Sequence, residues 1–198
     1  MKGKFIVFDG IGGCGKGTIV TMAEAWLKEQ GKSVMTTCEH TRDTSPGQLI
    51  EEILKGRSPK LEITAMQLLY VADRANHTLR VIKPGLEKYD FVLGDRYEAS
   101  TVSYALEKRR SYFMKANKGV TVKPDLTIII DLDPAEAVNR VNSRKDGDIF
   151  DKVEKLTICR EGYKWYFENS GRRCVWVDGS GSRDQVFERI KLEINKLL

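Results

Sequence analysis

The sequence predicts an α/β fold in which a five-stranded parallel sheet is flanked by helices in three layers. Short apolar runs alternate with helix-like segments along the whole chain. The first apolar run leads into a glycine-rich loop, and an amphipathic segment follows that loop directly. The chain has 198 residues, which is long enough for one well-buried core but short for two. We therefore expect a single domain.

The expected strands are short apolar runs, because helices cover both faces of a parallel sheet. These runs occupy residues 4–9, 33–37, 91–94, 126–132 and 174–177. The helix after the first loop is stopped by Gly31, and its apolar side chains recur at helical spacing. They are Ile19, Met22, Ala23, Trp26 and Leu27.

The later helices also carry local signals. A long helical stretch over residues 64–88 contains Pro84, which should kink or break it. Asp133 stands directly before a proline and provides an N-cap for the next helix. Ser182 and Gln185 form a capping pair for a C-terminal helix.

Composition narrows the class of protein. The chain is 41% hydrophobic and 31% charged, as in soluble globular proteins, and no apolar run approaches the roughly 18 residues that span a bilayer. No apolar signal segment precedes the first strand, so we expect a cytoplasmic protein without a membrane partner. The net charge of +5 suits polyanionic ligands, either nucleotides or nucleic acid. The cysteines lack C-x-x-C pairing and are expected to be reduced thiols; they are Cys14, Cys38, Cys159 and Cys174.

The glycine-rich loop carries the strongest functional signal. It reads GIGGCGKGT over residues 10–18, between the first strand and the first helix. Glycines let backbone N–H groups converge on phosphate oxygens, while the lysine and the helix dipole add positive charge. The motif predicts a nucleotide-binding P-loop NTPase fold, and an ordinary glycine-rich turn is the alternative. The ATP phosphates are expected on Gly10, Gly12, Gly13, Cys14, Gly15, Lys16, Gly17 and Thr18.

Two features near this loop concern magnesium. The residue after the P-loop lysine is usually Ser or Thr, whose hydroxyl binds the metal, but here it is Gly17, and Thr18 comes next. Lys-Gly-Thr at this place resembles the loop of adenylate kinases. Asp95 and Arg96 follow the third strand, at the sheet edge where an acid can hold Mg²⁺ and an arginine can bridge phosphates. We expect Mg²⁺ on Thr18 and Asp95, in part through water; a plain polar strand end is the alternative.

Five ordered segments resemble the thymidylate kinases of bacteria and archaea. FDGIGGCGK at 8–16 resembles F-E-G-x-D-G-x-G-K, TRD at 41–43 resembles T-R-E, and LLYVADRANH at 68–77 resembles L-L-F-A-A-D-R-A-Q-H. DRYEASTVSY at 95–104 resembles D-R-Y-x-x-S-x-x-A-Y, and PDLT at 124–127 matches the family's P-D-L-T. The resemblance implies one kinase domain over residues 1–198 that transfers the γ-phosphoryl of ATP to a deoxynucleoside monophosphate, with dTMP as first choice and dTDP as product. It also implies a homodimer.

The resemblance assigns roles in binding the monophosphate. Arg42 and Arg96 would grip its phosphate, which needs forked donors, and Asp9 belongs to the same site. Lys16, Asp95 and Arg96 are the expected catalytic residues in the first and third βα loops.

The base and sugar would lie against a second group of residues. Tyr70 would stack on the base, and Arg74 would reach the base edge. Ser100 and Tyr104 would line the sugar, where an aromatic ring favours deoxyribose. The alternatives are that both tyrosines are core residues and that Arg74 is a surface ion-pair partner.

Residues 142–151 resemble the family's lid. Arg144 and Lys145 are expected to close on the transferring phosphoryl group and neutralise its charge. Position 13 is a glycine where some relatives have an arginine, so Arg144 is the expected catalytic cation of the lid. A solvated charged turn is the alternative. Residues 177–182 resemble the loop that cups adenine in such kinases.

Two further departures bear on the substrate. Gly12 replaces an acid of the family's P-loop, and Ala105 replaces a glutamine that often follows the tyrosine. The base preference therefore stays open, and a kinase for dUMP, dCMP or a nucleoside is the nearest alternative. A non-catalytic P-loop protein is disfavoured by Lys16 and Asp95. A nucleic-acid-binding module is disfavoured because basic residues interleave with acidic ones.

Overall fold

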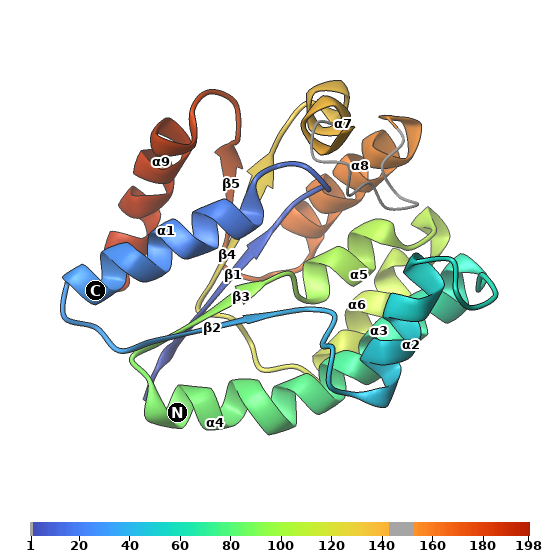
Figure 1. The fold of residues 1–198 in the computed structure, drawn as a ribbon, viewed down its shortest axis with the longest axis horizontal. Coiled ribbons are helices and arrows are strands. Elements are labelled where there is room, and N and C mark those ends of the chain that lie inside the picture. The colour runs from blue at the N-terminus through green and yellow to red at the C-terminus, as the bar shows by residue number, and fades with distance from the viewer. Residues whose placement is uncertain (1, 143–152) are drawn as a thin grey trace.

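The computed structural model describes residues 2–142 and 153–198, and Figure 1 shows their arrangement. Five parallel strands form one sheet in the order β2-β3-β1-β4-β5. The strands are β1 Lys4–Asp9, β2 Val34–Cys38, β3 Phe91–Asp95, β4 Leu126–Asp131 and β5 Cys174–Asp178. These bounds agree with the expected runs to within one residue.

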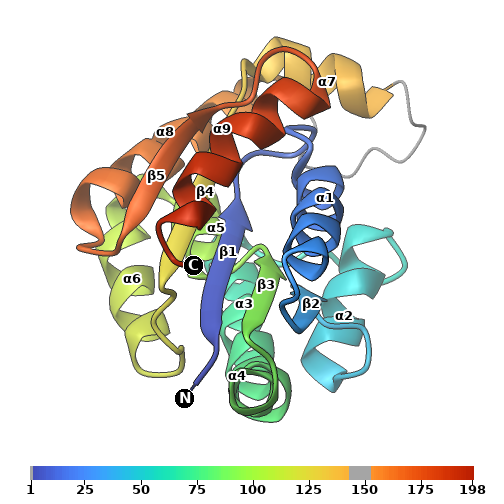
Figure 2. The same cartoon turned by 90° about the vertical axis from the view of Figure 1, so that its left-hand side faces the viewer.

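Helices cover both faces of the sheet. Helices α1 and α9 lie on one side of it, and α4, α5 and α8 lie on the other (Figures 1 and 2). No helix within the two described ranges is both long enough and apolar enough to cross a membrane. The predicted α/β fold with a helix-flanked parallel sheet is confirmed. The helices are α1 Lys16–Glu29, α2 Ser45–Leu54, α3 Ile63–His77, α4 Lys83–Lys88, α5 Glu98–Tyr104, α6 Arg110–Lys118, α7 Pro134–Asn142, α8 Val153–Asn169 and α9 Arg183–Asn195.

The long helical stretch is interrupted, as its proline predicts. A π-helical turn over Thr78–Ile82 separates α3 from α4. Pro84 stands in the first turn of α4, where a missing N–H is tolerated. Because Pro84 cannot donate to the carbonyl of residue 80, the change of helix type falls in the turn before it.

Both expected helix caps are present. The Asp133 carboxylate accepts the N–H groups of Ala135 and Glu136, at 2.9 and 3.2 Å, at the start of α7. At the start of α9, Ser182 and Gln185 form a reciprocal capping box. These local interactions fix where α7 and α9 leave the sheet.

Polar side chains gather where the strands end. Because all strands are parallel, their carboxyl ends share one edge of the sheet. Strands β1, β3, β4 and β5 end in aspartates, namely Asp9, Asp95, Asp131 and Asp178. The glycine-rich loop leaves the sheet at this same edge.

Candidate active site

The loop between β1 and α1 depends on glycines. Gly10, Gly13 and Gly15 have φ angles of 144°, 81° and 94°, which L side chains rarely adopt. A Cβ on Gly10 would overlap the backbone of Ile130, and one on Gly13 would overlap the backbone of Ala137. Gly15 gives α1 no side-chain cap, so the first N–H groups of the helix face the space above the loop. This is the geometry of an anion cradle.

Lys16 bends back over this cradle. Its ammonium donates to the carbonyl oxygens of Gly10 and Ile11, at 3.0 and 2.9 Å, and the side chain is largely buried. Its third donor faces the sulfur of Cys14 at 3.5 Å. Sulfur is a weak acceptor, so a phosphate oxygen would readily replace it without disturbing the two stronger bonds.

Asp9 joins the loop to the end of β3. Its fully buried carboxylate accepts backbone N–H groups from Gly10 at 3.0 Å, Tyr97 at 3.2 Å and Ser100 at 3.1 Å. It also accepts the hydroxyls of Ser100 at 2.7 Å and Tyr163 at 2.6 Å. Asp9 therefore fixes the relative positions of the loop, the turn after β3 and the start of α5.

Arg96 is held in an unusual conformation at this junction. It is the one non-glycine residue with positive φ, 69°, in the described part of the chain. Such strain is typical of functional sites, where surrounding contacts maintain it. Its Nη1 donates to the Gly10 carbonyl at 3.2 Å and to the hydroxyls of Ser100 at 3.0 Å and Tyr163 at 3.4 Å. The guanidinium lies over the Tyr104 ring, 5.7 Å from its centroid.

Arg74 is placed differently from the sequence-based expectation. It is 1% exposed, and its Nε and Nη2 bind the buried carboxylate of Glu39 at 2.8 and 2.5 Å. Nη1 donates to Thr101 at 2.6 Å and Asn117 at 2.7 Å, and Nη2 donates to the Tyr97 carbonyl at 2.9 Å.

Each nitrogen of the Arg74 guanidinium therefore has at least one partner inside the protein. A base-edge contact would break a buried charged hydrogen bond, so the structure offers no free donor for it. Arg74 is also no surface ion-pair partner, because Glu39 holds it in the core. His77 lies against the same carboxylate, 3.0 Å from Glu39, as a structural residue.

The other expected substrate residues lie around the same edge. Tyr70 is half-buried on α3, where its ring packs edge-on to His40 with centroids 6.2 Å apart. Tyr104 is half-buried and packs edge-on to Tyr163, at 6.3 Å. Arg42 is exposed in the β2–α2 loop.

Arg42 lies close enough to the strand ends to act electrostatically on groups there. Partial desolvation and the nearby Asp95 raise the pKa of the Cys38 thiol, and Arg42 lowers it. Cys38 is the register partner of Asp95 across β2 and β3. Arg42 therefore shares the edge on which Asp95 and Arg96 lie.

Asp95 offers a place for a cation. Its Oδ1 is buried and has no hydrogen-bond partner among the described residues. Gly17 faces this carboxylate, since a Cβ there would lie 3.6 Å from Oδ2. Thr18 is exposed and stands about 100° further around α1, so it is not the residue that faces Asp95. Of the two residues expected at the metal, Asp95 thus directs its carboxylate toward the start of α1 at Gly17, and Thr18 is exposed.

The loop after β5 is tied to the same edge. Gly179 donates its N–H to the Asp131 carbonyl at 2.6 Å. Arg189 of α9 donates to the carbonyl oxygens of Asp178 and Ser180, at 2.8 and 2.9 Å. The end of β5 and the loop after it, residues 177–182, are thus held to β4 and α9 at the carboxyl edge of the sheet, and the resemblance places adenine on this segment. The expected lid cations, Arg144 and Lys145, lie outside the described residues.

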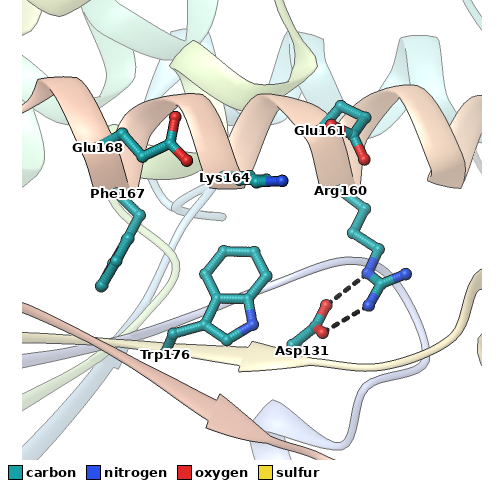
Figure 3. A pocket seen from close by; sticks show the side chains of 7 residues that line it. All are labelled: Asp131, Arg160, Glu161, Lys164, Phe167, Glu168 and Trp176. Carbon is teal, nitrogen blue, oxygen red and sulfur yellow. Dashed lines mark hydrogen bonds and ion pairs between the residues drawn. The ribbon is translucent and has the colours of Figure 1, made fainter.

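A separate pocket of about 480 Å³ lies between α8 and the β4–β5 edge (Figure 3). Arg160 closes one end with a two-pronged ion pair to Asp131, both bonds 2.6 Å long. Acids outnumber cations in the lining, and Arg160 is already neutralised, which disfavours a polyphosphate there. The lining residues are Asp131, Arg160, Glu161, Lys164, Phe167, Glu168 and Trp176.

Several residues of the site lie outside the sequence motifs. Tyr163 and Arg160 come from α8, which contains no recognised motif, and Glu39 and Asn117 complete the shell of Arg74. A polar residue at helical spacing carries no local signal of what it contacts in the fold. Only the packing of α8 against α5 and of α6 against α3 and α5 reveals these roles.

The phosphate-binding loop lies at the end of β1, and Arg96, which we call the phosphate grip, lies at the end of β3. Together they define a P-loop phosphotransferase. The sequence matches the thymidylate kinase family over residues 8–190. The chain belongs to the thymidylate kinase family. This membership confirms the sequence-based interpretation of an ATP-dependent nucleoside monophosphate kinase.

Individual relatives agree with the family match. The chain is 34% identical to a thymidylate kinase of Caldicellulosiruptor saccharolyticus over 210 residues, covering 100% of this chain and 98% of the relative. It is 38% identical to a probable thymidylate kinase of Pyrococcus abyssi over 162 residues, covering 79% and 78%. It is 33% identical to a thymidylate kinase of Nostoc punctiforme over 208 residues, covering 96% and 95%.

Proposed function

We propose that this protein transfers the γ-phosphoryl group of ATP to dTMP, giving ADP and dTDP, and that the residues at the β1 and β3 ends carry the reaction. One observation supports this most directly. Lys16 of the P-loop and Arg96, the phosphate grip, both donate to the Gly10 carbonyl, at 3.0 and 3.2 Å. The positively charged side chains for the two nucleotides therefore lie together where the donor and acceptor phosphates would meet.

In this proposal the protein positions two nucleotides and neutralises charge. Lys16 and the N–H groups of α1 hold the β- and γ-phosphates of ATP. Arg96 and Arg42 hold the phosphate of dTMP. Asp9 keeps the P-loop and the turn that carries Arg96 in fixed positions relative to each other. Mg²⁺, bound with ATP, would reduce charge repulsion between the phosphates, and Asp95 would hold it directly or through a water beside Gly17.

The remaining parts of the proposal follow the family resemblance. Residues 1–198 act as one domain, in which residues 142–151 form a lid that brings Arg144 and Lys145 to the transferring group. Tyr70 stacks on the base, while Ser100 and Tyr104 line the sugar. The protein works in the cytoplasm, which fits its four free thiols, among them the exposed Cys38.

A substrate panel tests the proposed reaction. ADP formation from ATP is measured with dTMP, dUMP, dCMP and thymidine. We expect the highest kcat/KM with dTMP, by about tenfold or more, since one well-placed contact distinguishes close analogues by 1–3 kcal/mol. Thymidine should be inactive, because it has no phosphate for Arg96 to hold. A preference for thymidine would contradict the assignment of Arg96, and no turnover with any acceptor would contradict the function.

The homodimer is also proposed, and an exposed apolar stripe supports it. Leu61, Leu68 and Leu79 are 43%, 42% and 61% exposed on and around α3. On α3, exposed Ala65 and Ala72 flank Leu68 at spacings of three and four residues, while Leu61 precedes the helix and Leu79 follows it. This is the spacing with which a helix packs against a second helix. A second copy of the chain would bury the stripe.

Leu68→Glu should separate the dimer, because it places a charge in the centre of the buried stripe. Size-exclusion chromatography with light scattering should give twice the chain mass for the wild type and a single chain mass for the variant. Leu192→Glu is the matched control, since Leu192 is 66% exposed on α9, away from the stripe. A wild-type monomer, or a dimer that survives Leu68→Glu, would contradict this interface.

A further inference from the structure

Helix α8 crosses α5 at a very short distance beside the site. A Cβ on Gly162 would overlap the backbone of Ser103, so α8 and α5 touch main chain to main chain at this crossing. The next residue, Tyr163, is 1% exposed and reaches past α5 to the end of β1. About one turn earlier on α8, Arg160 is clamped to Asp131 at the end of β4 (Figure 3). The position of α8 relative to the strand ends is therefore tightly defined.

The hydroxyl of Tyr163 makes three polar contacts at the phosphate grip. It donates to Asp9 Oδ1 at 2.6 Å, lies 2.9 Å from the Ser100 hydroxyl and accepts from Arg96 Nη1 at 3.4 Å. Burial, with the negative charge of Asp9, raises the pKa of Tyr163 well above its ordinary value. The phenol consequently stays protonated and remains a donor throughout the working pH range.

We propose that Tyr163 is a positioning residue for the monophosphate grip: its hydroxyl links the Asp9 carboxylate to the Arg96 guanidinium and so orients Arg96 toward the acceptor phosphate. This inference rests on the proposed function. Tyr163 does not touch the nucleotides in this role and acts through Arg96.

The contacts that remain without the hydroxyl predict which substrate is affected. Asp9 would keep its bonds from Gly10, Tyr97 and Ser100, so the P-loop entrance would stay in place. Arg96 Nη1 would lose one of its three hydrogen-bond acceptors and would face Asp9 Oδ1, 3.9 Å away, without the bridging hydroxyl between them. Binding of the monophosphate should weaken, whereas binding of ATP should not.

Tyr166 offers a matched control on the same helix. It is also 1% exposed, and its hydroxyl donates to a carboxylate, Glu98 Oε1, at 2.7 Å. Glu98 is further held by the Arg172 fork and by Thr121, apart from the phosphate grip. Tyr163→Phe and Tyr166→Phe thus remove the same kind of bond from equally buried sites, and each leaves its ring in place.

The test compares the full-length wild type with these two variants. Calorimetric titration gives the Kd for dTMP without ATP and the Kd for thymidine, turnover gives KM for ATP and dTMP, and thermal unfolding gives Tm. We expect a similar fall in Tm for both variants. Only Tyr163→Phe should raise the Kd and KM for dTMP, by about tenfold, with KM for ATP within about twofold. Thymidine affinity should be the same in all three proteins, because it lacks the phosphate.

Unchanged dTMP affinity in Tyr163→Phe, or equal losses toward dTMP and ATP, would overturn the inference, as would equal losses in both variants. The proposed function fails separately, if the wild type binds another monophosphate in place of dTMP. The same comparison with that monophosphate then tests Tyr163. A wild type that binds no monophosphate overturns both.

Discussion

Lys16→Ala should abolish nearly all phosphoryl transfer while leaving the fold intact. The ammonium is anchored on the Gly10 and Ile11 carbonyls and holds its third donor toward a weak sulfur acceptor. It is therefore positioned in advance for the charge that develops on the γ-phosphate. Removing one such donor costs about a hundred- to a thousandfold in kcat. The turnover number for ADP formation measures this loss.

Lys28→Ala serves as the control for Lys16→Ala. Lys28 lies on the same helix but is exposed and paired with Glu24 at 2.7 Å. This surface pair is worth little, so activity and Tm should match the wild type. Circular dichroism verifies that Lys16→Ala keeps the helical content. A Lys16→Ala variant that retains most of its kcat would contradict the P-loop assignment.

Arg96→Ala should raise KM for dTMP much more than KM for ATP. The guanidinium lies at the end of β3, and its described hydrogen bonds all leave from Nη1. A charged hydrogen bond is worth about 1.5–3 kcal/mol, which corresponds to roughly ten- to a hundredfold in KM. Steady-state kinetics with each nucleotide varied in turn separates the two constants.

The backbone at residue 96 provides a second test. Alanine at a φ of 69° keeps the strain of the left-handed region, whereas glycine relieves it. Arg96→Gly should therefore unfold at a higher temperature than Arg96→Ala, although both lose the phosphate grip equally. Arg172→Ala is the control for losing a partly buried arginine fork, since Arg172 binds Glu98 through bonds of 2.7 and 3.0 Å and does not contact the phosphate grip. It should lower Tm without changing KM for dTMP.

Equal increases in KM for ATP and dTMP in Arg96→Ala would mean that Arg96 shapes the site as a whole. Equal kinetics of Arg96→Ala and Arg172→Ala would contradict a role in binding phosphate. These outcomes separate the grip from a structural arginine.

The sequence alone determined the sheet and the phosphate loop, because both depend on local signals. Apolar runs of five or six residues mark strands that are buried on both faces, as β1 and β4 are. The glycines of the loop are needed wherever φ is positive and backbones approach closely, as at Gly10 and Gly13. The caps at Asp133 and Ser182 act within one turn of their helices and were predictable for the same reason.

The tertiary structure decided which polar side chains are available to a ligand. The sequence suggested a base-reading role for Arg74, yet Glu39, Thr101 and Asn117 occupy its donors. It predicted Thr18 and Asp95 for the metal, and the tertiary structure places Gly17 rather than Thr18 opposite the Asp95 carboxylate. The reason is that buried polar groups form hydrogen bonds with whichever groups the packing places beside them, and those neighbours come from distant parts of the chain.

The same reason explains why Tyr163 could not be found from the sequence. Its hydroxyl meets Asp9 across 154 positions of the chain, and only the close crossing at Gly162 brings the two together. Local patterns specify strands, loops and caps, because those contacts lie within a few residues. The contacts that orient a phosphate-binding arginine join distant segments, and only the packing of α8 onto the sheet creates them.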